Sequence, residues 1–275
     1  MLRISVLLLP YQPVLDNPTQ SQPILHGNTG LLSLISYNST KRTIILLPGN
    51  GDDENSNFSN ILIPAFLEVE DVNIILADWS RGASSFYVTA IRNTIAAGGS
   101  IARFINWLNS VTGATADMYH IVGHGHGGHM AGIAGRQVEG EVAYITGLDP
   151  SNYGWMLNRE KFRPEDGKYT EVIHTSAGIF GYLMTLADVD FYPNGGVNMP
   201  GCDGGLCDHG KSIQYFAESL RTGGFTGTRC LSYITAMIGN CGLRGRLQMG
   251  GIEPKTGSRG IFHMLTNRRS PFSRY

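Results

Sequence analysis

Short apolar runs alternate with longer segments of helical period along most of this chain. Six of the runs have the length of a strand, and each is followed by Gly, Pro, Asp or Ser, which are residues that end strands. The predicted strands are Thr43–Leu47, Val72–Ala77, Met118–Val122, Ala143–Leu148, Glu171–Thr175 and Val189–Tyr192. Because strands separated by helices are typical of parallel sheets, this alternation predicts an α/β fold with a mostly parallel central sheet covered by helices.

Helical period is clearest between the second and third of these strands. Apolar residues recur there at three- to four-residue and seven-residue spacings, which predicts one long helix. Its apolar face comprises Val88, Ile91, Ile95, Ile101, Ile105 and Leu108. Gly98 and Gly99 lie inside this helix, and the sequence leaves open whether they bend it or allow close packing. Two further helices are predicted to begin near His126 and near His209.

The two ends of the chain are predicted to add outer strands. Val6–Leu9 resembles a first strand, and Gly260–Thr266 resembles a closing one. Between Cys230 and Gly260 the chain is rich in Gly and has no clear period. We therefore expect an irregular excursion in that region.

The composition limits the possible architectures but does not identify a binding partner. A chain of 275 residues with 42% hydrophobic content is long enough to bury a full core, and we expect residues 1–275 to form one domain. The formal net charge of -1 supplies no sustained field for attracting nucleic acid. No apolar run reaches the length that crosses a bilayer, so we expect no membrane span.

A glycine-dense turn joins a predicted strand to a predicted helix at residues 119–129. Gly123, Gly125 and Gly127 occupy the three fixed positions of the nucleophile elbow, Gly-x-Ser-x-Gly, with glycine in the place of serine. Gly123, Gly125 and Gly128 also fit the dinucleotide fingerprint G-x-G-x-x-G, and Asp149 follows a strand about 20 residues later. The second motif is weak by itself, and we expect no cofactor.

Four histidines crowd the same segment and raise the question of a metal site. They are His120, His124, His126 and His129. A bound metal needs side chains that converge on one point, whereas these residues are spread over a strand, a turn and a helix. We therefore expect no metal at this turn.

The longest pattern begins at this turn and continues through further motifs in a fixed order. These are His120–Arg136, Ile145–Pro150, Glu171–Thr175, Asp188–Gly196, Pro200–Cys202, Cys207–Gly210 and Tyr215–Ser219. Together they resemble the neutral lipase family, which includes pancreatic lipases, venom phospholipases and the lipase-like yolk proteins of insects. The resemblance implies the α/β-hydrolase fold, with helices on both faces of the sheet. It also implies that residues 1–275 leave no room for the C-terminal β-sandwich domain of the vertebrate enzymes.

The resemblance assigns roles in a Ser-His-Asp triad. Asp149 fills the acid position, His209 the histidine position, and Gly125 the position of the nucleophilic serine. Glycine has no oxygen to acylate, and losing such a nucleophile costs on the order of a million-fold in turnover. Ser151 lies near the aspartate in sequence, but no elbow projects its hydroxyl, so we expect it to satisfy local backbone groups.

The oxyanion hole implied by the resemblance is also altered. In the family it uses the amide of the residue after the serine, which is His126 here, and an amide in a His-Gly-aromatic turn. The corresponding turn reads Leu47-Pro48-Gly49-Asn50. Pro48 and Asn50 are expected to change the geometry of the turn and the wall of the acyl pocket.

Four cysteines allow three pairings. The resemblance implies that Cys202 pairs with Cys207 around the lid, and that Cys230 pairs with Cys241 in a second local loop. The disulfide-flanked lid would then consist only of residues 203–206, which is too short to cover the site as a helix. The site would stand open.

We therefore expect a catalytically impaired lipase homologue that does not hydrolyse esters. Its function would be to bind a lipid or another hydrophobic small molecule in the cleft, or to serve as a yolk-like storage protein. A second hypothesis is a repurposed enzyme in which the His209–Asp149 pair performs acid-base chemistry. A dinucleotide-binding protein remains a third, weaker alternative.

Several signs favour an oxidising compartment. Two cysteine pairs are typical of secreted proteins, and two sequons make Asn38 and Asn57 candidate glycosylation sites. The expectation is a secreted protein whose signal peptide is not part of this sequence.

Overall fold

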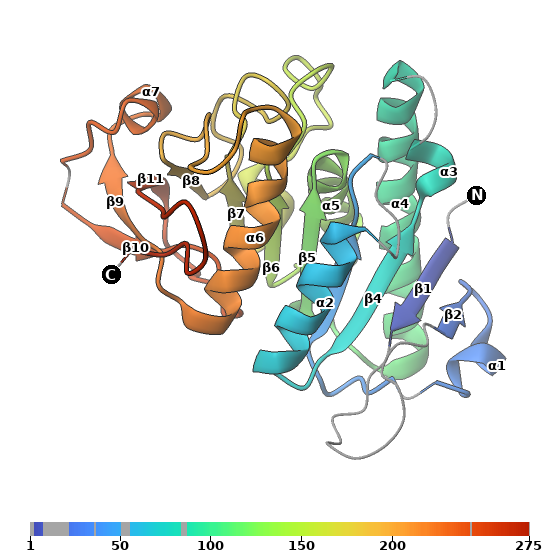
Figure 1. The fold of residues 1–275 in the computed structure, drawn as a ribbon. Helices are drawn as coiled ribbons and strands as arrows, with labels where there is room; N and C mark the ends of the chain where they lie inside the picture. Colours follow the sequence, from blue (N-terminus) through green and yellow to red (C-terminus); the bar gives the residue numbers. More distant parts are fainter. Residues whose placement is uncertain are drawn as a thin grey trace.

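The computed structural model describes residues 3–7, 22–35, 37–50, 56–83, 87–242 and 244–274 (Figure 1). Its strands are β1 Arg3–Leu7, β2 Gln22–Ile24, β3 Thr43–Leu47, β4 Asn73–Asp78, β5 Tyr119–His124, β6 Tyr144–Leu148, β7 Thr170–Ile173, β8 Val189–Pro193, β9 Thr226–Cys230, β10 Arg246–Gln248 and β11 Gly260–Met264. Its α-helices are α1 Thr29–Leu32, α2 Asn57–Val69, α3 Ser80–Ala83, α4 Tyr87–Thr112, α5 His126–Gln137, α6 Leu206–Thr222 and α7 Tyr233–Met237.

One sheet contains all the described strands, in the order β10-β9-β11-β8-β7-β6-β5-β3-β4-β1-β2. The run from β11 to β4 is parallel throughout. Antiparallel pairs are added at both sides, β1 with β2 on one side and β9 with β10 on the other. The carboxyl ends of the parallel strands therefore meet along one edge, where ligand sites of open α/β sheets form.

Helices cover both faces of the sheet (Figure 1). Helices α2 and α6 lie in front of it in that view, and α4 and α5 lie behind. Successive residues of β3 face opposite sides of the sheet. Ile44 and Leu46 pack on the side of α2 and α6, and Ile45 and Leu47 pack on the side of α4 and α5. All five residues of β3 are buried, which explains the continuous apolar run of its last four residues.

Helix α4 runs through Gly98 and Gly99 without a break. A Cβ atom on Gly98 would lie 2.6 Å from Cγ2 of Ile133 on α5, whereas one on Gly99 would meet only the ends of flexible side chains, Gln137 at 3.1 Å and Arg103 at 3.5 Å. The role of Gly98 is therefore to let α4 approach α5 closely, which is one of the two roles that the sequence left open.

The predicted strands and helices are found with shifted ends. Residues of Val6–Leu9 belong to β1 only as far as Leu7, and Leu8 and Leu9 lie outside the described residues. Helix α6 begins at Leu206, three residues before the expected start at His209. The excursion after Cys230 was expected to be irregular throughout, but it contains α7 and β10.

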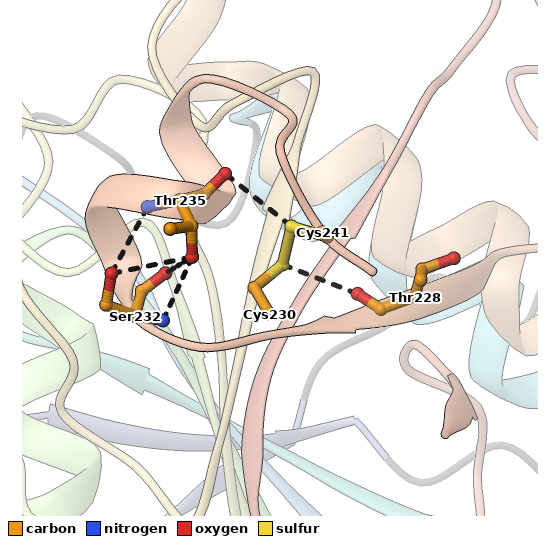
Figure 2. The surroundings of a disulfide bond; sticks show 5 residues. All are labelled: Thr228, Cys230, Ser232, Thr235 and Cys241. Atoms are coloured by element: carbon orange, nitrogen blue, oxygen red, sulfur yellow. Dashed lines mark hydrogen bonds between the residues drawn. A yellow bond between two sulfur atoms is a disulfide. The ribbon is translucent and has the colours of Figure 1, made fainter. Parts of the chain in front are cut away.

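Both predicted disulfides are present. Cys202 is bonded to Cys207, and Cys230 is bonded to Cys241. The second bond closes a loop around α7, whose first turn is capped by Ser232 and Thr235 (Figure 2). The α/β-hydrolase prediction, with a mostly parallel sheet, helices on both faces and a short disulfide-flanked lid segment, is confirmed. No helix in the described part of the chain is long and apolar enough to cross a membrane.

Candidate functional site

The turn between β5 and α5 has the backbone shape of an elbow. Gly125 has φ 55° and ψ -117°, a conformation that strains any residue with a side chain. The flanking glycines are required by close approach: a Cβ on Gly123 would lie 1.9 Å from the carbonyl oxygen of Gly127, and one on Gly127 would lie 2.0 Å from that of Leu47. This sequence therefore forms the turn with no side chain at its tip.

Asp149 follows β6 and is completely buried. Its Oδ1 accepts hydrogen bonds from the backbone amides of Thr175 at 2.8 Å and Ser176 at 3.0 Å. Its Oδ2 lies 2.6 Å from Nδ1 of His209 and accepts a hydrogen bond from the Ser176 hydroxyl. Burial acts to raise the pKa of Asp149, but the hydrogen bonds from His209 and Ser176 outweigh it and lower the pKa. Asp149 is therefore a carboxylate that fixes the proton of His209 on Nδ1.

The other nitrogen of His209 faces the elbow. A Cβ atom on Gly125 would lie 3.1 Å from Nε2 of His209 and 3.5 Å from Oγ of Ser151. Gly125, Asp149 and His209 thus come together from three separate segments, at the ends of β5 and β6 and in the first turn of α6. The arrangement can orient an imidazole and accept a proton at Nε2, but no hydroxyl stands at the elbow.

Ser151 departs from the expectation drawn from its sequence position. Its amide donates to the carbonyl of Gly125 at 3.1 Å, so the backbone of residue 151 is tied to the elbow. Its hydroxyl forms no hydrogen bond among the described residues and points toward the space beside Gly125. The prediction that this hydroxyl satisfies local backbone groups was wrong, because the turn after Asp149 carries Ser151 back against the elbow.

The two residues named for the oxyanion hole have different surroundings. Asn50 is exposed at the end of the described turn. His126 is buried, and its Nδ1 accepts a hydrogen bond from Nε1 of Trp155 at 3.1 Å. Burial, and then the electrostatic interaction with His209, lowers the pKa of His126 to about 4. Its side chain therefore packs as a neutral ring beside Trp79 and Trp155.

The turn before Asn50 is held by a tertiary hydrogen bond that was not predicted from the sequence. The indole Nε1 of Trp79 donates to the carbonyl oxygen of Pro48 at 2.9 Å. Nothing in the local spacing of Trp79 or Trp155 signalled these contacts, because both arise from tertiary packing around His126.

The other histidines of the elbow segment face different partners. His120 Nε2 lies 2.8 Å from the Thr146 hydroxyl, and His129 Nε2 lies 2.8 Å from the carbonyl of Ser151. His124 packs against His209, with ring centroids 4.2 Å apart. In the described ranges, no three His, Cys, Asp or Glu side chains are grouped to hold a metal ion.

The contacts of Asp149 bear on the dinucleotide alternative. Binding a ribose would require this carboxylate to accept bonds from the sugar hydroxyls. Both of its oxygens are occupied by His209, Thr175 and Ser176, and the residue is fully buried. The arrangement therefore argues against a nucleotide at this turn.

Exposed apolar side chains lie on the loops that follow β6 and β7 and at the start of α6. Phe180 is 42% exposed, and its ring centroid lies 5.9 Å from that of His209. The loops that follow β6 and β7 are joined by a hydrogen bond from the Asn152 amide to the Phe180 carbonyl at 2.8 Å. Further exposed apolar residues on these loops and at the start of α6 are Tyr153, Met156, Leu157, Ile179 and Leu206. The edge is thus rich in apolar surface.

A second histidine-aspartate pair supports the loop that carries Phe180. His174 Nε2 lies 2.9 Å from Oδ1 of Asp190, and its Nδ1 lies 3.0 Å from the carbonyl of Tyr182. Both members of this pair are buried. The sequence motifs contained the two residues, but only the fold reveals that they pair.

Comparison with known proteins agrees with this architecture. The sequence model of the Lipase family matches residues 4–272. The chain is 34% identical over 254 residues to lipase member H-B of Xenopus laevis, covering 86% of this chain and 54% of that protein. It is 32% identical over 254 residues to the pancreatic triacylglycerol lipase of Myocastor coypus, covering 82% of this chain and 55% of that protein. The chain spans about half the length of these relatives. The extent of the family match, together with these identities, means that this chain belongs to the lipase family.

Proposed function

We propose that this protein is a lipase homologue that does not cleave esters through an acyl-enzyme and instead binds a lipid or another hydrophobic molecule beside Gly125. The observation that carries the proposal is the glycine at the elbow. Nε2 of His209 approaches the position of a Gly125 Cβ at 3.1 Å, yet that residue has no oxygen to activate. The attacking group of acyl transfer is therefore missing while its partners are in place.

The apolar surroundings support the choice of ligand. Phe180 and Leu206, which are 42% and 73% exposed, lie on the segments next to His209. Large exposed apolar areas mark binding surfaces more often than isolated apolar residues do. The ligand we propose is accordingly hydrophobic, and a yolk-like storage role is compatible with the same chemistry.

The decisive experiment combines covalent labelling with lipid extraction. Purified protein is treated with a fluorophosphonate and tested on a panel of esters, and natively purified protein is extracted for mass spectrometry. We expect no labelling, no turnover above the background of buffer, and a co-purified lipid. Labelling of any side chain at the elbow would overturn the proposal.

Two substitutions at one position separate the missing oxygen from backbone strain. Gly125→Ser and Gly125→Ala both place a Cβ at a positive φ, and each should lower the free energy of unfolding by about 1–3 kcal/mol. Only the serine variant supplies an oxygen, so only it should gain fluorophosphonate labelling. The gain should be partial, because the ring of His209 must withdraw slightly to admit the side chain. Equal labelling of the two variants would contradict this account.

The His209–Asp149 pair favours a second candidate function, acid-base chemistry on a substrate seated at the elbow. The pair is linked at 2.6 Å, and the side chain of His209 keeps 14% of its surface exposed. His209→Ala should then abolish whatever turnover a substrate screen uncovers. Unchanged turnover in that variant would remove this candidate.

We also propose that the protein is secreted and that residues 1–275 act as one domain. Two disulfides are typical of proteins made in an oxidising compartment. The candidate glycosylation residues Asn38 and Asn57 are both exposed. Expression through a secretory pathway, followed by glycosidase treatment and mass measurement, tests this: an unmodified protein with free thiols would contradict it.

A further inference from the structure

Two polar atoms from separate segments flank the space beside Gly125. Nε2 of His209 would lie 3.1 Å from a Cβ on this glycine, and Oγ of Ser151 would lie 3.5 Å from the same point. Ser151 is 8% exposed, and the side chain of His209 is 14% exposed. Neither Nε2 of His209 nor the hydroxyl of Ser151 has a hydrogen-bond partner within the described ranges. Both atoms therefore have hydrogen-bonding capacity left for a polar group from outside the chain.

The protons on this pair define what that group must be. Asp149 is a carboxylate 2.6 Å from Nδ1 of His209, so the neutral ring carries its proton on Nδ1. Nε2 then offers a lone pair and accepts a hydrogen bond. The Ser151 hydroxyl both donates and accepts. A ligand group that donates to one atom and accepts from the other satisfies both.

We propose, building on the lipid-binding function above, that the ligand is an amphipathic alcohol whose hydroxyl sits between His209 and Ser151. An alcohol donates its O–H to Nε2 and accepts from the serine. An ester carbonyl or an ether oxygen only accepts, so it leaves the lone pair of Nε2 unsatisfied. The apolar body of the alcohol lies along the exposed apolar residues near Phe180. No bond is made or broken in this interaction.

A matched series of decyl compounds tests this in delipidated protein. The probes are 1-decanol, decyl methyl ether, decane and decanoate, with affinity measured by calorimetry. We expect 1-decanol to bind about fivefold more tightly than its ether, which is the effect of one hydrogen bond. A competition arm with cholesterol, which carries the same hydroxyl, distinguishes a linear from a ring-shaped apolar body.

Substitution of the serine gives the second arm. The oxygens of the alcohol and of the ether both accept from the Ser151 hydroxyl, so Ser151→Ala should weaken the binding of both by a similar factor. His209→Phe, which removes the acceptor for the alcohol proton, should remove the preference for the alcohol. Ser110→Ala, an exposed serine on α4, is the matched control for Ser151→Ala and should leave both affinities unchanged. If Ser151→Ala does not fold, the ratio of alcohol to ether affinity in the unmodified protein still decides the question.

The outcomes separate this inference from the function on which it rests. Equal affinities for alcohol, ether and decane would overturn the hydroxyl site and leave lipid binding standing. Tighter binding of decanoate than of 1-decanol would also overturn it, because a carboxylate needs two donors at the elbow. Failure of every probe to bind would overturn both claims.

Discussion

Three histidines of the elbow segment enter the folded protein without charge. Burial lowers the pKa of His126 to about 4 and that of His129 to about 3, and it holds the pKa of His120 well below its ordinary value. In the unfolded chain each imidazole titrates near about 6.5. Folding and proton binding therefore oppose each other at these residues.

This opposition predicts loss of stability in mild acid. Below about pH 6.5 the unfolded state binds more protons than the folded state, so the free energy of unfolding falls as the pH drops toward 4. His126 and His129 each contribute on the order of 2 kcal/mol to this loss at pH 5, and His120 acts in the same direction. Thermal unfolding followed from pH 7.5 to pH 5 at constant ionic strength should show a steadily falling Tm.

A pair of glutamine variants identifies the source of the effect. His126→Gln keeps an acceptor for the Trp155 indole but does not titrate, so it should reduce proton uptake on unfolding by about one proton. His26→Gln, at an exposed position, is the control for the substitution itself. A Tm that stays level across this range would contradict the assignment of neutral buried rings.

The close packing of helix α4 on α5 requires Gly98 but not Gly99. Gly98→Ala would place a methyl group 2.6 Å from Cγ2 of Ile133, and such overpacking costs about 1–3 kcal/mol. Gly99→Ala meets only the movable ends of Gln137 and Arg103 and should be neutral, or stabilising by up to about 1 kcal/mol, since alanine favours helix. Urea denaturation of the two variants measures the difference; equal effects would mean that the approach of α4 to α5 is not what requires Gly98.

The disulfide around α7 is expected to stabilise the fold more than the one at the lid. Cys230 and Cys241 are 11 positions apart, whereas Cys202 and Cys207 are 5 apart. The chain-entropy relation gives about 3 kcal/mol for the longer loop and about 2 kcal/mol for the shorter. Double alanine variants of each pair, compared in urea, should follow that order. A larger loss from the Cys202 and Cys207 variant would reverse the interpretation.

At the scale of the whole molecule, the parallel strands of the sheet could be predicted from the sequence, whereas the strands at its two sides could not. Runs such as Thr43–Leu47 are buried on both faces, so their apolar composition identifies them directly. β9 has a mixed burial pattern and β10 has only three residues, so neither has a period that can be recognised without its neighbours. Their existence depends on the strands that they pair with.

The candidate site was also predicted only in part. The positions of Gly125, Asp149 and His209 followed from a resemblance in ordered motifs, and the structure brings them together. Ser151 and Ser176 reach the same point from loops whose path depends on the whole fold. No local pattern encodes such a path, which is why the sequence assigned Ser151 the wrong surroundings.

The outermost described strands of the sheet, β2 and β10, are each three residues long. In β10 the side chains of Arg246 and Gln248 are exposed and only Leu247 is half-buried. Short outer strands, one with Pro23 and the other with Arg246, give an approaching chain few backbone groups to pair with. Crowded copies of this protein should accordingly resist pairing edge to edge into fibres.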